Sequence, residues 1–127
     1  MIYIRATAHG EPDMPPLVRV YQYSDDDDEL ILEHSAAMVH EKLGRGLKVN
    51  VNEAMLLCCH QVVRGMRQGV VDKNARILAA DQAMVGVAET LMVIVFDAVV
   101  DGRRQLITLK EPIPPTGYAM AAFPHKV

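Results

Sequence analysis

The chain has 127 residues, 50% of them apolar, with 16 acidic and 13 basic side chains and a formal net charge of −3. Because a chain of this size can bury about two thirds of its unfolded surface, we expect one domain spanning residues 1–127. The charges are mixed along the chain, which argues against a nucleic-acid platform, and no apolar run reaches the roughly 18 residues of a membrane helix.

The cellular location is expected to be the cytoplasm. The N-terminus lacks the order of charge, apolar run and cleavage site that marks a signal peptide. The only cysteines, Cys58 and Cys59, are adjacent and poorly placed to pair with each other, which suits a reducing compartment. We therefore expect a protein that binds neither nucleic acid nor a membrane.

Residues 1–23 contain two strand-like runs, IYIRATA and LVRVYQY, separated by HGEPDMPP, whose glycine and prolines interrupt regular structure. This pattern predicts a hairpin with a long loop. Two strands alone are marginal in water, so at least one is expected to pair with the C-terminal hairpin, within the chain or across a subunit boundary. Exchange across a boundary would reinforce a homo-oligomer.

A first helix is predicted from about Asp25 to Gly44, with Ser24 as its N-cap. The acidic run SDDDDE favours a helix start, because carboxylates in the first turn interact with the positive end of the helix dipole. We interpret this acidic run as a solvated segment in preference to a cation-binding site. The stripe expected to face the core has helical spacing and consists of Leu32, Ala36, Val39 and Leu43.

The stretch GRGLKVNVNEA, residues 44–54, predicts a tight corner between two helices. Gly46 is expected to end the first helix, because glycine adopts a positive φ without a Cβ penalty. An extended link follows, and Asn50 is expected to cap the second helix with Glu53 as the reciprocal arm of a capping box.

The second helix is predicted at residues 51–68, with Gly69 as its stop. Gly65 lies inside its apolar pattern and is best explained by close approach of another backbone, most simply another helix. A shorter helical piece is expected at residues 72–87. Residues 91–100 and 103–109 then form two strands around an Asp101–Gly102 turn.

The predicted fold class is α+β, with about three to four helices packed together and on a small antiparallel sheet. The search for catalytic or metal-binding patterns is negative. HEKLG, which begins at His40, has a glycine where a zincin helix needs its second histidine. Cys58, Cys59 and His60 point about 100° apart on a helix and cannot converge on one ion. His34 with Glu33 or Glu41 has no third partner, so we expect no active site here.

Four segments carry a resemblance to the urease gamma subunit family, and the resemblance covers the chain from about Ser24 to Ile113. They are RGLKVNVNEA at the corner, VVRGMRQG at the end of the second helix, AADQAMVGVAETL in the third helical piece and DGRRQLITLKEPI around the hairpin turn. On this resemblance, residues 24–113 form the family core. Residues 1–23 are then an N-terminal β extension and residues 114–127 a C-terminal tail.

The resemblance implies an accessory role. In that family the gamma subunit is a non-catalytic structural subunit that packs with the alpha and beta subunits around a threefold axis, and the nickel ions lie in the large alpha subunit. It implies no catalytic residue, metal ligand or cofactor in this chain, and it favours a homotrimer. The positions that it marks as structural are Gly46, Asn50 and Glu53 at the corner, Gly65 at a close helix contact, and Asp101 and Gly102 at the hairpin turn.

Two other functions stay open on the sequence alone. The chain could form a freestanding oligomeric scaffold or binding protein of the same fold without urease activity, or it could be a self-sufficient enzyme that uses its histidines. Genes for alpha and beta subunits beside this one would favour the urease subunit, and their absence would favour the scaffold.

Overall fold

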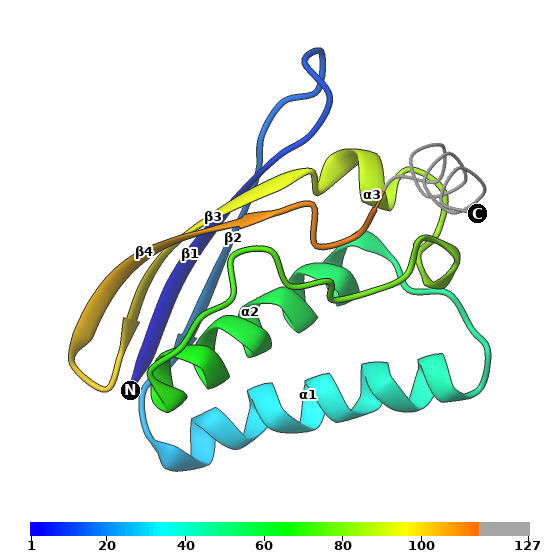
Figure 1. Cartoon of the computed structure of the whole chain (residues 1–127). Helices are drawn as coiled ribbons and strands as arrows, with labels where there is room; N and C mark the ends of the chain where they lie inside the picture. The colour runs from blue at the N-terminus through cyan, green and yellow to red at the C-terminus, as the bar shows by residue number, and fades with distance from the viewer. Residues whose placement is uncertain (115–127) are drawn as a thin grey trace.

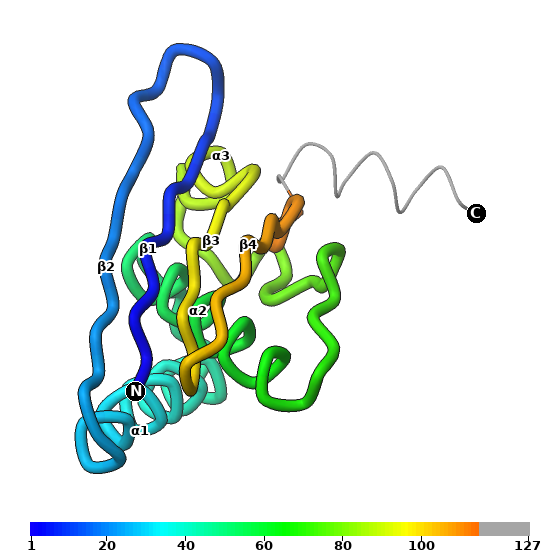
Figure 2. The backbone as a smooth tube through the Cα atoms, turned by 90° about the vertical axis from the view of Figure 1, so that its left-hand side faces the viewer, coloured from blue at the N-terminus to red at the C-terminus, as the bar shows by residue number. Residues whose placement is uncertain are grey.

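The computed structural model describes residues 1–114, so most of the C-terminal tail expected from residue 114 onward lies outside the described residues. The described part has two layers. A four-stranded antiparallel sheet forms one layer, and the helices cover only one of its faces (Figures 1 and 2). The predicted α+β class is confirmed.

The sheet has the strand order β2-β1-β3-β4, built from β1 (Ile2–His9), β2 (Leu17–Tyr23), β3 (Val93–Val100) and β4 (Arg103–Lys110). Both predicted hairpins are confirmed, and the loop between β1 and β2 projects beyond the sheet (Figure 1). β1 also pairs with β3 along its full length within the same chain. The prediction that an N-terminal strand joins the C-terminal hairpin is therefore confirmed, with the pairing inside one chain.

Two long helices, α1 (Asp26–Gly44) and α2 (Val51–Gln68), lie against the covered face of the sheet. Their bounds agree closely with the prediction. The N-cap of α1 is Asp25 and not Ser24, because Asp25 is extended and its carboxylate accepts the Asp28 N–H at 2.9 Å. Ser24 instead donates its own N–H to the Asp28 carboxylate at 3.2 Å.

The prediction of a helix at residues 72–87 is largely wrong. Residues 72–79 are irregular, and only a short 3₁₀ helix, η1 (Ala80–Gln82), and a single turn, α3 (Val87–Thr90), follow. The backbone groups of this segment are bound elsewhere. Ile77 donates to the Pro112 carbonyl at 2.8 Å, and the Lys73 carbonyl accepts from the strand β4 at 3.0 Å. Pairing with the chain around β4 thus replaces the internal bonds of a helix.

The core lies between the sheet and the two long helices. In β1 and β3 the buried positions alternate with exposed or half-buried ones, as expected for a sheet with one covered face. In α1 the predicted stripe holds: Leu32, Ala36 and Val39 are buried, and Leu43 packs against the core while half-buried. The largest buried side chain is Phe96 at the centre of β3.

Candidate functional site

The corner between α1 and α2 ends the first helix as the sequence predicts. Gly46 has φ of +77°, and its N–H donates to the Leu43 carbonyl at 2.9 Å. The Leu47 N–H reaches back to the Lys42 carbonyl at 3.2 Å. This pair of bonds is a Schellman motif, in which a left-handed glycine satisfies carbonyls that the helix leaves unpaired.

The start of α2 carries the predicted capping box. The Asn50 side chain accepts the Glu53 N–H at 2.9 Å, and the Glu53 carboxylate accepts the Asn50 N–H at 2.9 Å. The same carboxylate oxygen binds the Lys42 ammonium of α1 at 2.9 Å. Burial acts to raise the pKa of Glu53, but the Asn50 N–H and Lys42 outweigh it and hold the pKa below its ordinary value. Glu53 therefore joins both helices at the corner.

A second segment lies against the corner. Val49 is fully buried and forms a parallel bridge with Ala83, and the Met84 N–H donates to the Val49 carbonyl at 2.9 Å. Close to this contact in the sequence, Leu47, Met84 and Val85 are exposed, and Val85 is fully so. We call these three residues the corner patch.

Gly65 of α2 does meet another backbone, but not that of another helix. Gly69 has φ of +83° and ends α2, after which the chain turns back over the last helical turn. A Cβ at Gly65 would lie 2.7 Å from the Val70 carbonyl oxygen and 2.9 Å from Val71 Cγ2. The predicted helix–helix contact at Gly65 is therefore wrong. The absent side chain makes room for the chain that leaves the same helix.

An ion-pair cluster joins the far ends of α1 and α2 to the sheet. Arg67 of α2 donates to both carboxylate oxygens of Asp101 at 3.0 Å and also to Glu29 of α1. The N-terminal ammonium of Met1 lies 3.1 Å from Glu29. Glu29 is the most enclosed member, with 11% of its side chain exposed. The cluster thus ties two helices and the β3–β4 turn together.

The charges in this cluster support one another. Burial acts to raise the pKa of Glu29, but hydrogen bonds from Arg67 and the N-terminal ammonium outweigh it, so the pKa lies below its ordinary value of 4.5. The Arg67 hydrogen bonds also lower the pKa of Asp101. Asp101 and Gly102 have φ of +53° and +80°, the positive pair that a tight two-residue hairpin turn requires.

The histidines and cysteines show no arrangement suited to catalysis within residues 1–114. Cys58 and Cys59 are fully buried and unpaired, and burial raises the pKa of Cys58 to about 12, so its thiol is not a ready nucleophile. Glu33 contacts His60 Nε2 at 2.9 Å, a partner on α2 and not the neighbouring His34. In these residues no three His, Cys, Asp or Glu side chains gather in a way that could hold a metal ion. None of their helices is long and apolar enough to span a membrane.

Comparison with known proteins identifies relatives of this chain. The family described as "Urease, gamma subunit" matches residues 21–113. The urease subunit gamma of Prochlorococcus marinus (strain NATL1A) is 31% identical over 99 residues, which cover 74% of this chain and 99% of that relative. The chain belongs to the urease gamma subunit family. As a member of this family it is a structural, non-catalytic subunit of urease.

The structural positions marked by the resemblance all lie within the part that matches the urease gamma family, whereas β1 lies before it. Sequence reasoning missed Glu29 and the ion-pair role of Arg67. The signal was present, because Arg67 is part of VVRGMRQG and Glu29 ends the acidic run. Nothing in the spacing of Glu29 and Arg67 along the sequence showed that the two side chains meet near the hairpin turn.

Proposed function

We propose that this chain is the gamma subunit of a urease-type nickel amidohydrolase, in which it packs against alpha and beta subunits and supports their assembly. The observation that carries the proposal is the family match over residues 21–113. In this proposal residues 1–127 act as one cytoplasmic domain, with residues 24–113 as the family core, residues 1–23 as an added β extension and residues 114–127 as a tail. The nickel belongs to the alpha subunit, and this chain holds no cofactor.

The corner patch is the surface that we assign to these partners. Val85 is fully exposed, and exposed apolar side chains that lie close together mark interaction sites. The patch is also held in place. The capping box fixes the corner, and the hydrogen bond from Met84 to Val49 fixes the loop that carries Val85. A preordered patch loses little conformational freedom when it binds.

The test is co-purification of the full chain with the alpha and beta subunits from the same host. Val85→Glu places a charge in the corner patch and should reduce the recovered complex by about tenfold or more, because charges are unfavourable in an interface core. Val70→Glu is the matched control. Val70 is also exposed, but it follows the opposite end of α2. Wild-type recovery with Val85→Glu would contradict the assignment of the patch.

The assembly has a threefold axis in this proposal, so three copies of the chain belong to one particle. The purified chain supplied with nickel should release no ammonia from urea, whereas the assembled complex should. The second candidate is a freestanding scaffold of the same fold, and it is favoured by the added strand β1 outside the family-matched residues. Failure to bind alpha and beta subunits, together with a stable homo-oligomer, would favour that candidate.

A further inference from the structure

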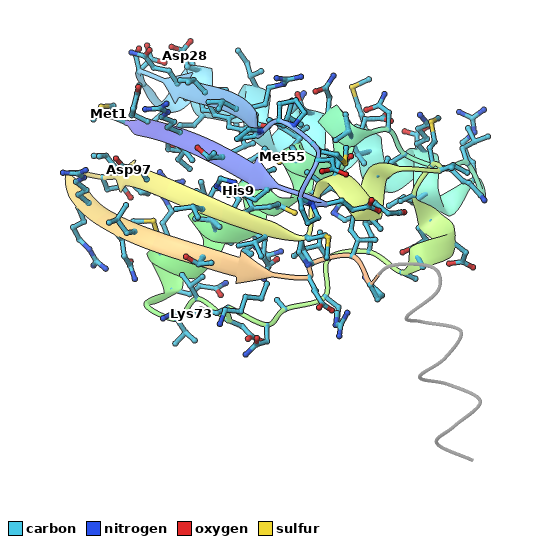
Figure 3. The ribbon with its side chains drawn as sticks, turned by 90° about the horizontal axis from the view of Figure 1, so that it is seen from above. Met1, His9, Asp28, Met55, Lys73 and Asp97 are labelled. Atoms are coloured by element: carbon cyan, nitrogen blue, oxygen red, sulfur yellow. The ribbon has the colours of Figure 1, made fainter. Side chains whose placement is uncertain are left out.

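The free edge of the sheet is the strand β2. It forms one rim of the sheet in Figure 2, and within residues 1–114 no strand pairs with its outer side. Seen from above in Figure 3, β4 forms the opposite rim near Lys73, and there the Lys110 N–H is bound by the Lys73 carbonyl at 3.0 Å. The two edges therefore differ, because the chain itself covers part of the β4 edge. An uncovered strand edge is a template for pairing with another chain.

The register identifies which backbone groups of β2 point outward. The Asp101 N–H donates to the Met1 carbonyl at 3.0 Å, so the odd residues of β1 bond to β3 and the even ones to β2. Ile4 therefore forms a hydrogen-bonded pair with Tyr21, and Ala6 with Arg19. The outward backbone groups of β2 are those of Val18, Val20 and Gln22. Of these, the Val18 carbonyl accepts from its neighbour Arg19 at 2.9 Å.

We propose that two copies of this chain pair through their β2 strands, antiparallel and centred on Val20. A two-fold axis at Val20 places it opposite the partner's Val20, with Val18 opposite the partner's Gln22. Because three outward residues are evenly spaced about this centre, each finds a hydrogen-bonding partner and none is left over. The two sheets then join into one continuous sheet across the axis.

The side chains of β2 suit this register. On the uncovered face, Val20 meets the partner's Val20, a β-branched pair of the kind that stabilises neighbouring strands. Val20 is 54% exposed in the single chain, so the contact removes apolar surface from water. On the other face, Arg19 lies opposite the partner's Tyr21, where a guanidinium can stack on the ring. Arg19 is the only charged residue of β2, and it does not directly face its own copy.

The location of the edge favours a second copy over an alpha or beta subunit. Most of β2 and all of β1 precede the family-matched residues 21–113, so this edge is an addition to the family core. The surfaces assigned to urease partners lie at the corner, on the matched part. The two-fold contact can therefore coexist with the threefold particle proposed above, and it would then join two such particles.

Disulfide trapping tests the register directly. In a hydrogen-bonded antiparallel pair the Cα atoms are about 5.5 Å apart, within the reach of a disulfide. Val20→Cys in the full chain should therefore form a covalent dimer of twice 14.1 kDa under mild oxidation, visible on a non-reducing denaturing gel. The native cysteines do not compete, because both are fully buried.

Val18→Cys is the matched control on the same strand and face. In the proposed register its two copies are four residues apart along the strands, roughly 13 Å, which a disulfide cannot bridge. Trapping by Val20→Cys and not by Val18→Cys supports the proposal. Equal trapping by both variants, trapping by Val18→Cys alone, or no trapping by either overturns it.

Sedimentation of the isolated chain over a concentration series gives an independent measurement. A single strand edge buries less than a standard interface of about 800 Å² per partner, so we expect a reversible dimer that forms as concentration rises. Val20→Pro removes the central N–H from both copies and should weaken association by about tenfold or more. A wild-type chain that stays monomeric at all concentrations overturns the proposal. Failure to bind urease partners would leave this result unchanged, so the two proposals are tested separately.

Discussion

Replacing Gly65 with alanine should destabilise the chain although alanine is the better helix former. The new Cβ would lie 2.7 Å from the Val70 carbonyl oxygen and 3.2 Å from the Val71 Cα, and both are backbone atoms that cannot rotate away. Overpacking of this kind costs about 1–3 kcal/mol, against a gain of at most about 1 kcal/mol from helix propensity. We expect a net loss of about 1–2 kcal/mol and a fall in melting temperature of roughly 3–8 °C.

Gly44→Ala is the matched control, because Gly44 ends α1 and a Cβ there would meet nothing within 4 Å. This change should leave the stability unchanged or raise it by about 0.4–1 kcal/mol through the unfolded state. Thermal and urea unfolding followed by circular dichroism measure both variants. The reasoning is refuted if Gly65→Ala melts at or above the wild-type temperature, since the chain after Gly69 would then move away from the new Cβ without any loss of stability.

Three further results are expected. Arg67→Gln should cost about 1–3 kcal/mol in urea unfolding, because it leaves the enclosed Glu29 with one fewer cationic partner, whereas Arg104→Gln on the exposed face should melt close to wild type. The pKa of Glu29 in the folded chain lies below its ordinary 4.5, so the carboxylate stabilises the fold above about pH 4.5, and this stabilisation is lost as the pH falls through the folded pKa. The free energy of unfolding should therefore fall less steeply with acid in Glu29→Gln than in wild type. Deleting residues 1–23 removes the buried side chains of β1, and the lost burial is of the order of the whole stability of a domain, so the truncated chain should not fold cooperatively. A cooperative thermal transition near the wild-type temperature would contradict this expectation.

Local sequence signals predicted the elements whose structure is decided locally. The corner is one, since Gly46 needs a positive φ and Asn50 with Glu53 forms a box from neighbouring residues. The Asp101–Gly102 turn is another, because its chemistry sets both the turn and the strand register. Such features need no knowledge of distant parts of the chain.

What the sequence did not predict depends on segments far apart in the chain. Residues 72–79 have helix-forming side chains, but their backbone is bound by the chain around β4, which periodicity does not reveal. Gly65 was correctly expected to meet a backbone, yet the identity of that backbone followed from the reversal at Gly69. The pairing of Arg67 with Glu29 likewise joins residues on two helices whose relative rotation is set by the core.

The place of β1 in the sheet has a consequence for how the chain folds. It precedes the other three strands of the described sheet in the chain, yet it lies between β2 and β3, and β3 begins only at Val93. The N-terminal hairpin can form early, and α1 and α2 can cover its apolar face, but the outer edge of β1 must wait until β3 emerges from the ribosome. Closing a loop of this length makes folding slow, and a waiting edge is open to wrong pairing. For this chain, the order of synthesis makes the unfinished sheet the stage most exposed to aggregation.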